Sequence, residues 1–189
     1  MDKKTKQDPY ICCLQKTYLL SKNIHRLKVK GWKKLSHANG MENKAEAAVL
    51  VSDKINIETK AIVRDEDRHC IMTKATMQQQ DISVVHINAP NIGAPKYVKE
   101  TLTDLNGEID RNAVIFGDLT TPLASMDRSS TWKINNDAVA LSDTLDQMDL
   151  TDIFRAFHPK ATEYTWFSKA HGTYSRIDNL LGHKQVSIN

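Results

Sequence analysis

The sequence predicts an α/β domain in which two packed sheets are flanked by helices. Short apolar, β-rich runs separated by short polar links fill the first half of the chain, up to Asn88. An apolar stripe with helical spacing then follows at Val98, Leu102, Leu105 and Ile109. Strand-like runs return after it. Strands with helices between and outside them are typical of sheets whose faces are covered by helices.

The strand candidates of the first half lie close together along the chain. They are residues 10–14, 32–35, 45–51, 62–63, 70–77 and 82–87. Their short connections favour a meander of antiparallel strands over strand–helix–strand units.

The second half alternates strands with helices. The wholly apolar run 113–116 is typical of a strand buried on both faces. A second helical stripe covers residues 141–148, and a short helix is expected over 152–157. Late strands are expected at 165–167 and 174–181.

Bulk composition fits one ordinary domain that spans the whole chain. Its 189 residues, 40% hydrophobic and 26% charged, are enough to bury about 70% of the unfolded surface. The apolar runs are too short for a membrane-spanning helix, and the polar start of the chain does not predict a secretion signal. Two of the three cysteines are adjacent in a strand candidate, which favours buried thiols in the cytosol or nucleus.

Charge is unevenly distributed along the chain. Residues 1–34 hold ten Lys or Arg against two Asp, a balance of +8, whereas the whole chain is only +3. Such a basic segment can meet nucleic-acid phosphates. It can equally be a solvated basic face, and both interpretations stay open.

Asp118 is the first candidate site residue. It follows the buried strand directly, after Gly117, which we expect to turn the chain where the strand ends. A carboxylate at the end of a buried strand is costly unless it binds a metal, a hydrogen-bond donor or a substrate. In α/β sheets, ligands bind at the carboxyl ends of the strands. The alternative is that Asp118 only caps the turn closed by Pro122.

Three further polar sites accompany Asp118. They are the loops 15–17 and 88–91, and Asp178 within the last strand candidate. If these strand ends lie together, they form one polar pit. Asp118 and Asp178 could there bind Mg²⁺, which takes one or two carboxylates and keeps several waters.

Seven motifs then carry a resemblance. In order they read C-C-L-Q-K-T, V-S-D-K, I-N-A-P-N-I-G-A-P, F-G-D-L-T-T-P-L, L-D-Q-M-D-L-T-D-I-F-R, H-P-K-A-T-E-Y-T-W-F-S and T-Y-S-R-I-D-N. Over about Thr5 to Lys184 the chain resembles the endonuclease domain of the mammalian long interspersed element (retrotransposon) reverse transcriptase polyprotein. That domain is similar to the apurinic/apyrimidinic endonucleases, exonuclease III and DNase I, of the endonuclease/exonuclease/phosphatase superfamily.

The resemblance implies a fold, a reaction and a partner. The fold is a four-layer α/β sandwich of the DNase I type. The reaction is Mg²⁺-dependent hydrolysis of a DNA phosphodiester, with T/A-rich sites nicked to prime reverse transcription. DNA is the implied partner, without a membrane or a small-molecule cofactor.

The resemblance also implies roles for individual residues. Asp118 matches the family Asp that orients or deprotonates the attacking water, and Asp178 matches the Asp that supports the catalytic His. Asn91 matches a phosphate-side contact. The remaining matches lie in segments that meet DNA in the family, namely Arg128, Thr165 and Ser175.

Three departures predict weak or lost activity. Lys16 stands where the family has a metal-binding Glu, and an ammonium 4 Å from Mg²⁺ is repelled by roughly 8 kcal/mol at an effective dielectric constant near 20. Asn88 replaces a Tyr that steadies the transition state, and Thr120 replaces an Asn. Both remain candidate catalytic positions.

The chain is also expected to be incomplete at both ends. It begins after the family's first strand and stops before the segment with the catalytic His. We therefore predict a nearly or wholly inactive endonuclease domain. One alternative is a non-catalytic DNA-binding module that uses the basic N-terminal segment 1–34 and the loops at Arg128, Thr165 and Arg176. The other is a chain without a stable fold.

Overall fold

The computed structural model describes residues 9–20, 28–39, 44–64, 69–130 and 136–184. Its elements are β1 (Ile11–Leu20), β2 (Trp32–Asn39), β3 (Lys44–Ser52), β4 (Ile57–Arg64), β5 (Cys70–Met77), β6 (Gln80–Asn88), α1 (Ala94–Asp104), β7 (Val114–Asp118), the 3-10 turn η3 (Ser125–Asp127), α2 (Asn136–Gln147), β8 (Leu150–Asp152), α3 (Ile153–Phe157), β9 (Trp166–Ser168), β10 (Thr173–Ser175) and β11 (Asp178–His183). Within these ranges, no helix combines the length and apolar character that crossing a membrane requires.

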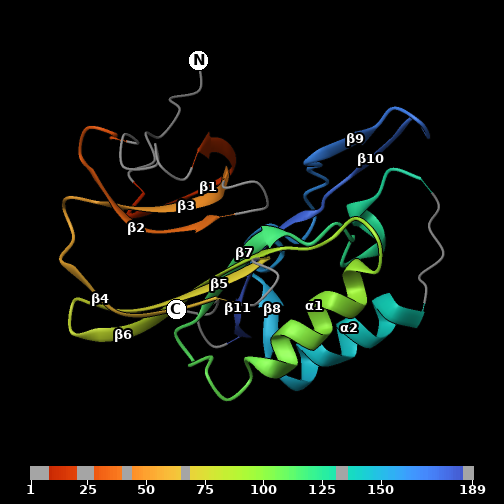
Figure 1. Cartoon of the computed structure of the whole chain (residues 1–189). Helices are drawn as coiled ribbons and strands as arrows, with labels where there is room; N and C mark the ends of the chain where they lie inside the picture. The colour runs from red at the N-terminus through yellow and green to blue at the C-terminus, as the bar shows by residue number, and fades with distance from the viewer. Residues whose placement is uncertain (1–8, 21–27, 40–43, 65–68, 131–135, 185–189) are drawn as a thin grey trace.

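The strands form two sheets and a separate hairpin. The large sheet has the order β4-β5-β6-β7-β11-β8, and the small sheet has the order β1-β3-β2. Strands β9 and β10 pair with each other and project from the body as a two-stranded hairpin (Figure 1).

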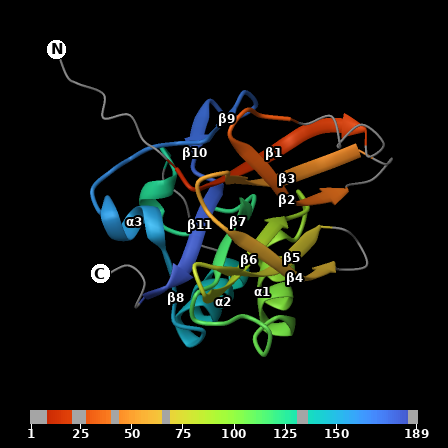
Figure 2. The same cartoon turned by 90° about the vertical axis from the view of Figure 1, so that its left-hand side faces the viewer.

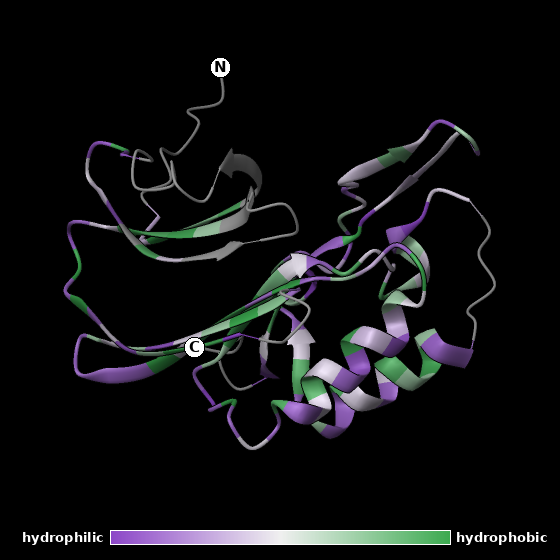
Figure 3. Cartoon of the chain, viewed as in Figure 1, coloured by the Kyte–Doolittle hydropathy of each residue, from purple (hydrophilic) through white to green (hydrophobic). Residues whose placement is uncertain are grey.

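The central strands of the large sheet, β6 and β7, are buried on both faces, whereas β4 at one edge is mostly exposed. The small sheet lies over one face, and α1 and α2 cover the other (Figures 1 and 2). The inter-sheet core contains Val49, Val84 and Phe116, whereas Val85 and Ile115 belong to the core beneath the helices. Alternate residues of β6 and β7 thus face opposite layers, as the pleat requires, and Figure 3 shows apolar segments on both sides of this sheet.

The predicted meander is confirmed for the large sheet but not for the small one, where β1 pairs with β3 and not with β2. Strands β4, β5 and β6 form an antiparallel meander, and β6–α1–β7 is a crossover that joins two parallel strands. Helix α1 ends at Asp104, earlier than its stripe predicts. Leu105 and Ile109 nevertheless pack against the core, because the turns after the helix keep them on the same side.

Gly117 has a different role from the one expected. It lies inside β7, not beyond its end, and pairs with Ile87 of β6. A Cβ at Gly117 would lie 1.7 Å from the Ile87 carbonyl oxygen. The glycine is therefore needed because two parallel strands approach closely there.

The late strand expected over residues 174–181 is two strands. β10 pairs with β9, whereas β11 pairs with β7 and β8. Arg176 and Ile177 separate them.

Candidate active site

Three predicted site residues lie side by side at one end of the large sheet. In the parallel ladder of β6 and β7, Asn88 pairs with Asp118. In the antiparallel ladder of β7 and β11, Asp118 pairs with Asp178. The chain brings them together from distant positions, and we call them the Asn88–Asp118–Asp178 row. The strand ends that carry these three residues are therefore adjacent, which is the condition that the sequence analysis set for a polar pit.

Asp118 is the buried centre of the row, with 5% of its surface exposed. Its Oδ1 accepts a hydrogen bond of 2.9 Å from the Thr120 backbone N–H, which closes a turn two residues on. Its backbone carbonyl accepts one of 2.8 Å from the N–H of Ala89. The carboxylate thus does cap its turn, as the alternative interpretation held, while it also lies between two polar neighbours.

Thr120 adopts an unusual backbone conformation. Its φ is +49°, in the left-handed region that β-branched residues rarely occupy. Its hydroxyl donates to the Pro90 carbonyl at 3.1 Å. Thr120 therefore joins the two loops that border the row, at the cost of local strain.

His86 is a further neighbour of the row. It lies two residues before Asn88 on β6, so it shares the face of the row. It is 3% exposed, its ring packs 5.0 Å from that of Phe116, and its Nδ1 has no hydrogen-bond partner among the described residues. Burial lowers the pKa of His86 to about 4, although the charge of Asp118 partly opposes this.

Three predicted DNA-contacting residues meet at the base of the hairpin. Arg128 forms a β-bridge with Ser175, whose carbonyl accepts the N–H of Thr165 at 3.0 Å. Ser175 is buried, whereas Thr165 is exposed. Thr165 also accepts two backbone hydrogen bonds through Oγ1, from Ile177 at 3.1 Å and Asp178 at 3.2 Å.

Arg176 does not lie on the exposed loop that a DNA contact requires. Its side chain is 5% exposed and forms ion pairs with Asp152 and Asp127. It also lies over the Phe154 ring, 4.6 Å from the centroid. Burial alone disfavours its charge, yet the bonds and charges of the two carboxylates outweigh this and raise the pKa of Arg176. Its contacts are made within the protein.

Two further predictions lie at the margin of the site. Asn91 is exposed in the loop between β6 and α1. The side chain of Lys16 lies outside the described residues, although its backbone belongs to β1. The structure therefore leaves the expected repulsion between Lys16 and a metal as a prediction.

The row offers the ligands of a hard cation. Carboxylate and amide oxygens suit Mg²⁺, which needs only one or two protein carboxylates. No group of three or more His, Cys, Asp or Glu with metal-binding geometry occurs in the described parts of the chain. The donor set of the row therefore fits Mg²⁺ better than a metal bound wholly by protein, such as structural zinc.

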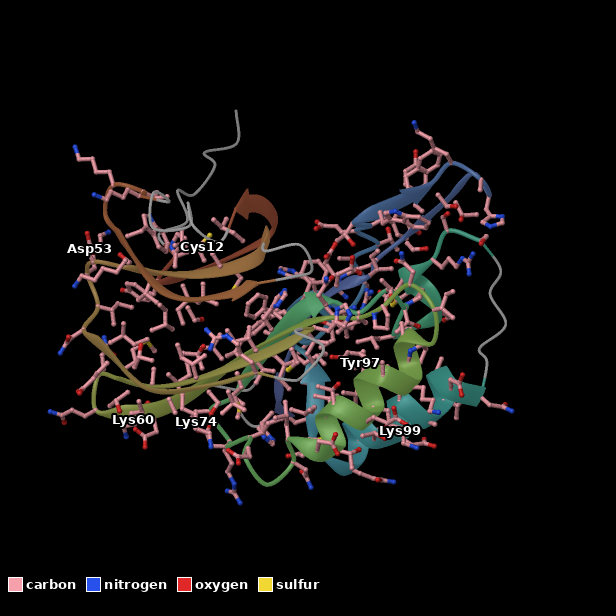
Figure 4. All side chains as sticks on the ribbon, viewed as in Figure 1. Cys12, Asp53, Lys60, Lys74, Tyr97 and Lys99 are labelled. Carbon is pink, nitrogen blue, oxygen red and sulfur yellow. The ribbon has the colours of Figure 1, made fainter. Side chains whose placement is uncertain are left out.

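Most side chains of the basic segment 1–34 lie outside the described residues. Lys28, Lys30 and Lys33 are described, and all three are exposed. Lys60 and Lys74 of the large sheet lie far from the hairpin (Figure 4), and both are ion-paired.

No protein-family model matches the chain. The endonuclease domain of TRAS1, a telomere-specific non-LTR retrotransposon, aligns with a TM-score of 0.66 at 11% identity, over 93% of this chain and 74% of that one. D. rerio TDP2 complexed with a single-strand DNA product aligns with a TM-score of 0.60 at 13% identity, over 94% of this chain and 72% of that one. ANGEL2, a 2′,3′-cyclic phosphatase, aligns with a TM-score of 0.54 at 11% identity, over 90% of this chain and 69% of that one. The chain therefore has the DNase I-like α/β sandwich fold that these structures share.

Proposed function

We propose that this chain binds DNA at the end of the sandwich that carries the Asn88–Asp118–Asp178 row, and hydrolyses a phosphodiester there slowly with Mg²⁺. The observation that carries the proposal is the strand register, which aligns an amide and two carboxylates on three adjacent strands. The fold shared with the TRAS1 endonuclease domain and with TDP2 in a DNA-product complex supports it.

Each residue of the row has a role in this proposal. Asp118 and Asp178 would hold Mg²⁺, which neutralises charge developing on the phosphodiester. Asp118 also orients the attacking water and takes its proton. The Asn88 amide donates a hydrogen bond to a phosphate oxygen.

Catalysis is expected to be weak because of the residues at three positions. Lys16, Asn88 and Thr120 stand where the resembling family has Glu, Tyr and Asn. Loss of one group that stabilises a transition state commonly lowers the rate by about 10²–10³, and losses within one catalytic unit do not simply add. We therefore expect nicking only at high enzyme concentration.

The test is relaxation of supercoiled plasmid with millimolar Mg²⁺. We expect slow nicking that is absent in EDTA and in Asp118→Asn, and that persists in Asp53→Asn, an exposed carboxylate of the small-sheet turn (Figure 4). Nicking that survives Asp118→Asn would contradict the assignment of the site.

A second candidate function is DNA binding without catalysis, and the hairpin favours it. Trp166, Phe167 and Tyr174 are 48%, 44% and 49% exposed. Tyr174 also packs 4.7 Å from Phe167 and stacks 5.9 Å from Tyr164. Exposed aromatic rings on a projecting element are suited to stacking on unpaired bases.

Fluorescence anisotropy with labelled single-stranded DNA separates the two candidates. We expect Trp166→Ala to weaken binding about tenfold or more, since stacking contributes about 1–3 kcal/mol per base. Phe157→Ala is the matched control, because Phe157 is 59% exposed on α3 and away from the hairpin. Binding without any Asp118-dependent nicking would favour the non-catalytic function, and its salt dependence would measure the phosphate contacts.

A further inference from the structure

The hairpin is joined to the row by only two residues. β10 ends at Ser175 and β11 begins at Asp178, so Arg176 and Ile177 form the whole connection, which we call the joint. Asp178 is the first residue of β11 and the end member of the row. The joint therefore leads directly into the residue that pairs with Asp118.

An ion cluster anchors the joint from within the protein. Arg176 donates to both carboxylate oxygens of Asp152, and its Nη1 lies 3.7 Å from Oδ1 of Asp127. The Arg176 backbone N–H also donates to the Asp127 carbonyl at 2.7 Å. Asp127, 1% exposed, is held in turn by Arg155 and by the Ala124 N–H. The first residue of the joint is thus fixed by side chain and backbone together.

Thr165 clamps the other side of the joint. Its Oγ1 accepts from the N–H of Ile177 and from the N–H of Asp178. The Ile177 carbonyl accepts from the N–H of Leu119, which follows Asp118 directly, at 2.9 Å. A continuous set of hydrogen bonds therefore runs from the hairpin base through the joint to the loop of the central carboxylate.

We infer that Thr165 and Arg176 are positioning residues that hold Asp178 beside Asp118 and set the hairpin against the row. The inference rests on the proposed function, because it assigns these two residues to the support of that site. It differs from the expectation that they contact DNA. The Thr165 hydroxyl accepts backbone donors of the joint, and Arg176 is buried.

The test compares Thr165→Val, which keeps the shape and loses the acceptor, with Thr165→Ser, which keeps the acceptor. Thr103→Val on α1 is the control, since Thr103 is also exposed and hydrogen-bonded through its hydroxyl. Three quantities are measured for each chain: amide hydrogen exchange at Asp178, the Mg²⁺ concentration that gives half of the Mg²⁺-induced rise in melting temperature, and DNA affinity in EDTA.

We expect Thr165→Val to speed Asp178 amide exchange about tenfold, because a lost acceptor weakens protection by about one hydrogen bond. The half-saturating Mg²⁺ concentration should rise about tenfold, as is common when support for a metal ligand is removed. DNA affinity in EDTA should stay within about twofold. Thr165→Ser and Thr103→Val should match the wild type in all three.

Two results would overturn the inference. One is unchanged Asp178 exchange in Thr165→Val. The other is a loss of DNA affinity in EDTA with an unchanged Mg²⁺ requirement, which would make Thr165 a DNA contact. If the wild type shows no response to Mg²⁺, the proposed function fails separately, and faster Asp178 exchange in Thr165→Val alone would still support the positioning role.

Discussion

The buried imidazole of His86 predicts that this protein loses stability as the pH falls from about 6.5 to about 4. Burial lowers the pKa of His86 from 6.5 to about 4 in the folded protein, whereas the unfolded chain titrates near 6.5. Between these values the unfolded chain binds a proton that the folded protein does not, so acid favours unfolding. Above pH 6.5 both states carry neutral imidazole, and this source of instability is absent.

The magnitude follows from the two pKa values. A difference of about 2.5 corresponds to about 3 kcal/mol, with a slope of at most about 1.4 kcal/mol per pH unit within the window. Since small domains are stable by about 5–15 kcal/mol, one residue would remove a large part of the total near pH 4. The Nδ1 without a partner among the described residues is consistent with this cost, because no acceptor there compensates a new charge.

The assay is urea denaturation at several pH values between 7.5 and 4, with wild type and His86→Gln compared at each. Carboxylates titrate in both chains, so the difference between the two free energies of unfolding isolates the histidine. We expect the free energy of unfolding of the wild type, relative to that of His86→Gln, to fall by about 3 kcal/mol from pH 7.5 to pH 4. His171→Gln, at the exposed hairpin tip, is the matched control. Parallel profiles for wild type and His86→Gln would refute the reasoning.

Three other substitutions test the architecture of the site. Thr120→Asn should raise the free energy of unfolding by about 1 kcal/mol, because Asn tolerates the φ of +49° that strains a β-branched residue. An unchanged urea midpoint would contradict this. Gly117→Ala should prevent native folding, since its Cβ would meet the Ile87 carbonyl. A native-like circular dichroism spectrum and thermal melt would argue against so close an approach of β6 and β7. Arg176→Met should cost about 3–5 kcal/mol in chemical denaturation, because it leaves the largely buried Asp152 carboxylate without its arginine partner and removes one of the two arginines beside Asp127. A loss below about 1 kcal/mol would show that these pairs are dispensable.

Local patterns predicted most of the elements. The stripe at Val98 and Leu102 identified α1, and the wholly apolar run before Gly117 identified β7, because periodicity depends on near neighbours along the chain. Element ends were less accurate. β1 continues to Leu20, and α1 ends before Leu105, since pairing and packing decide where a helix or strand stops.

The sequence by itself determined which chemistry the site can contain. Its motifs named Asp118, Asp178 and Asn88 as candidates, and its departures at Lys16 and Thr120 predict that catalysis is weak. These are properties of residue type and of order along the chain, so they can be read without coordinates.

Only the tertiary structure decided which of these residues meet. The register of β7 with β6 and β11 placed Asn88 and Asp178 on either side of Asp118, and no local signal specifies a partner strand so far away in sequence. Arg176 was likewise expected to contact DNA, but its side chain is buried in the structure, because Asp152 and Asp127 from distant segments pair with it. Burial and pairing depend on contacts between remote parts of the chain, and those contacts form only when the sheets assemble.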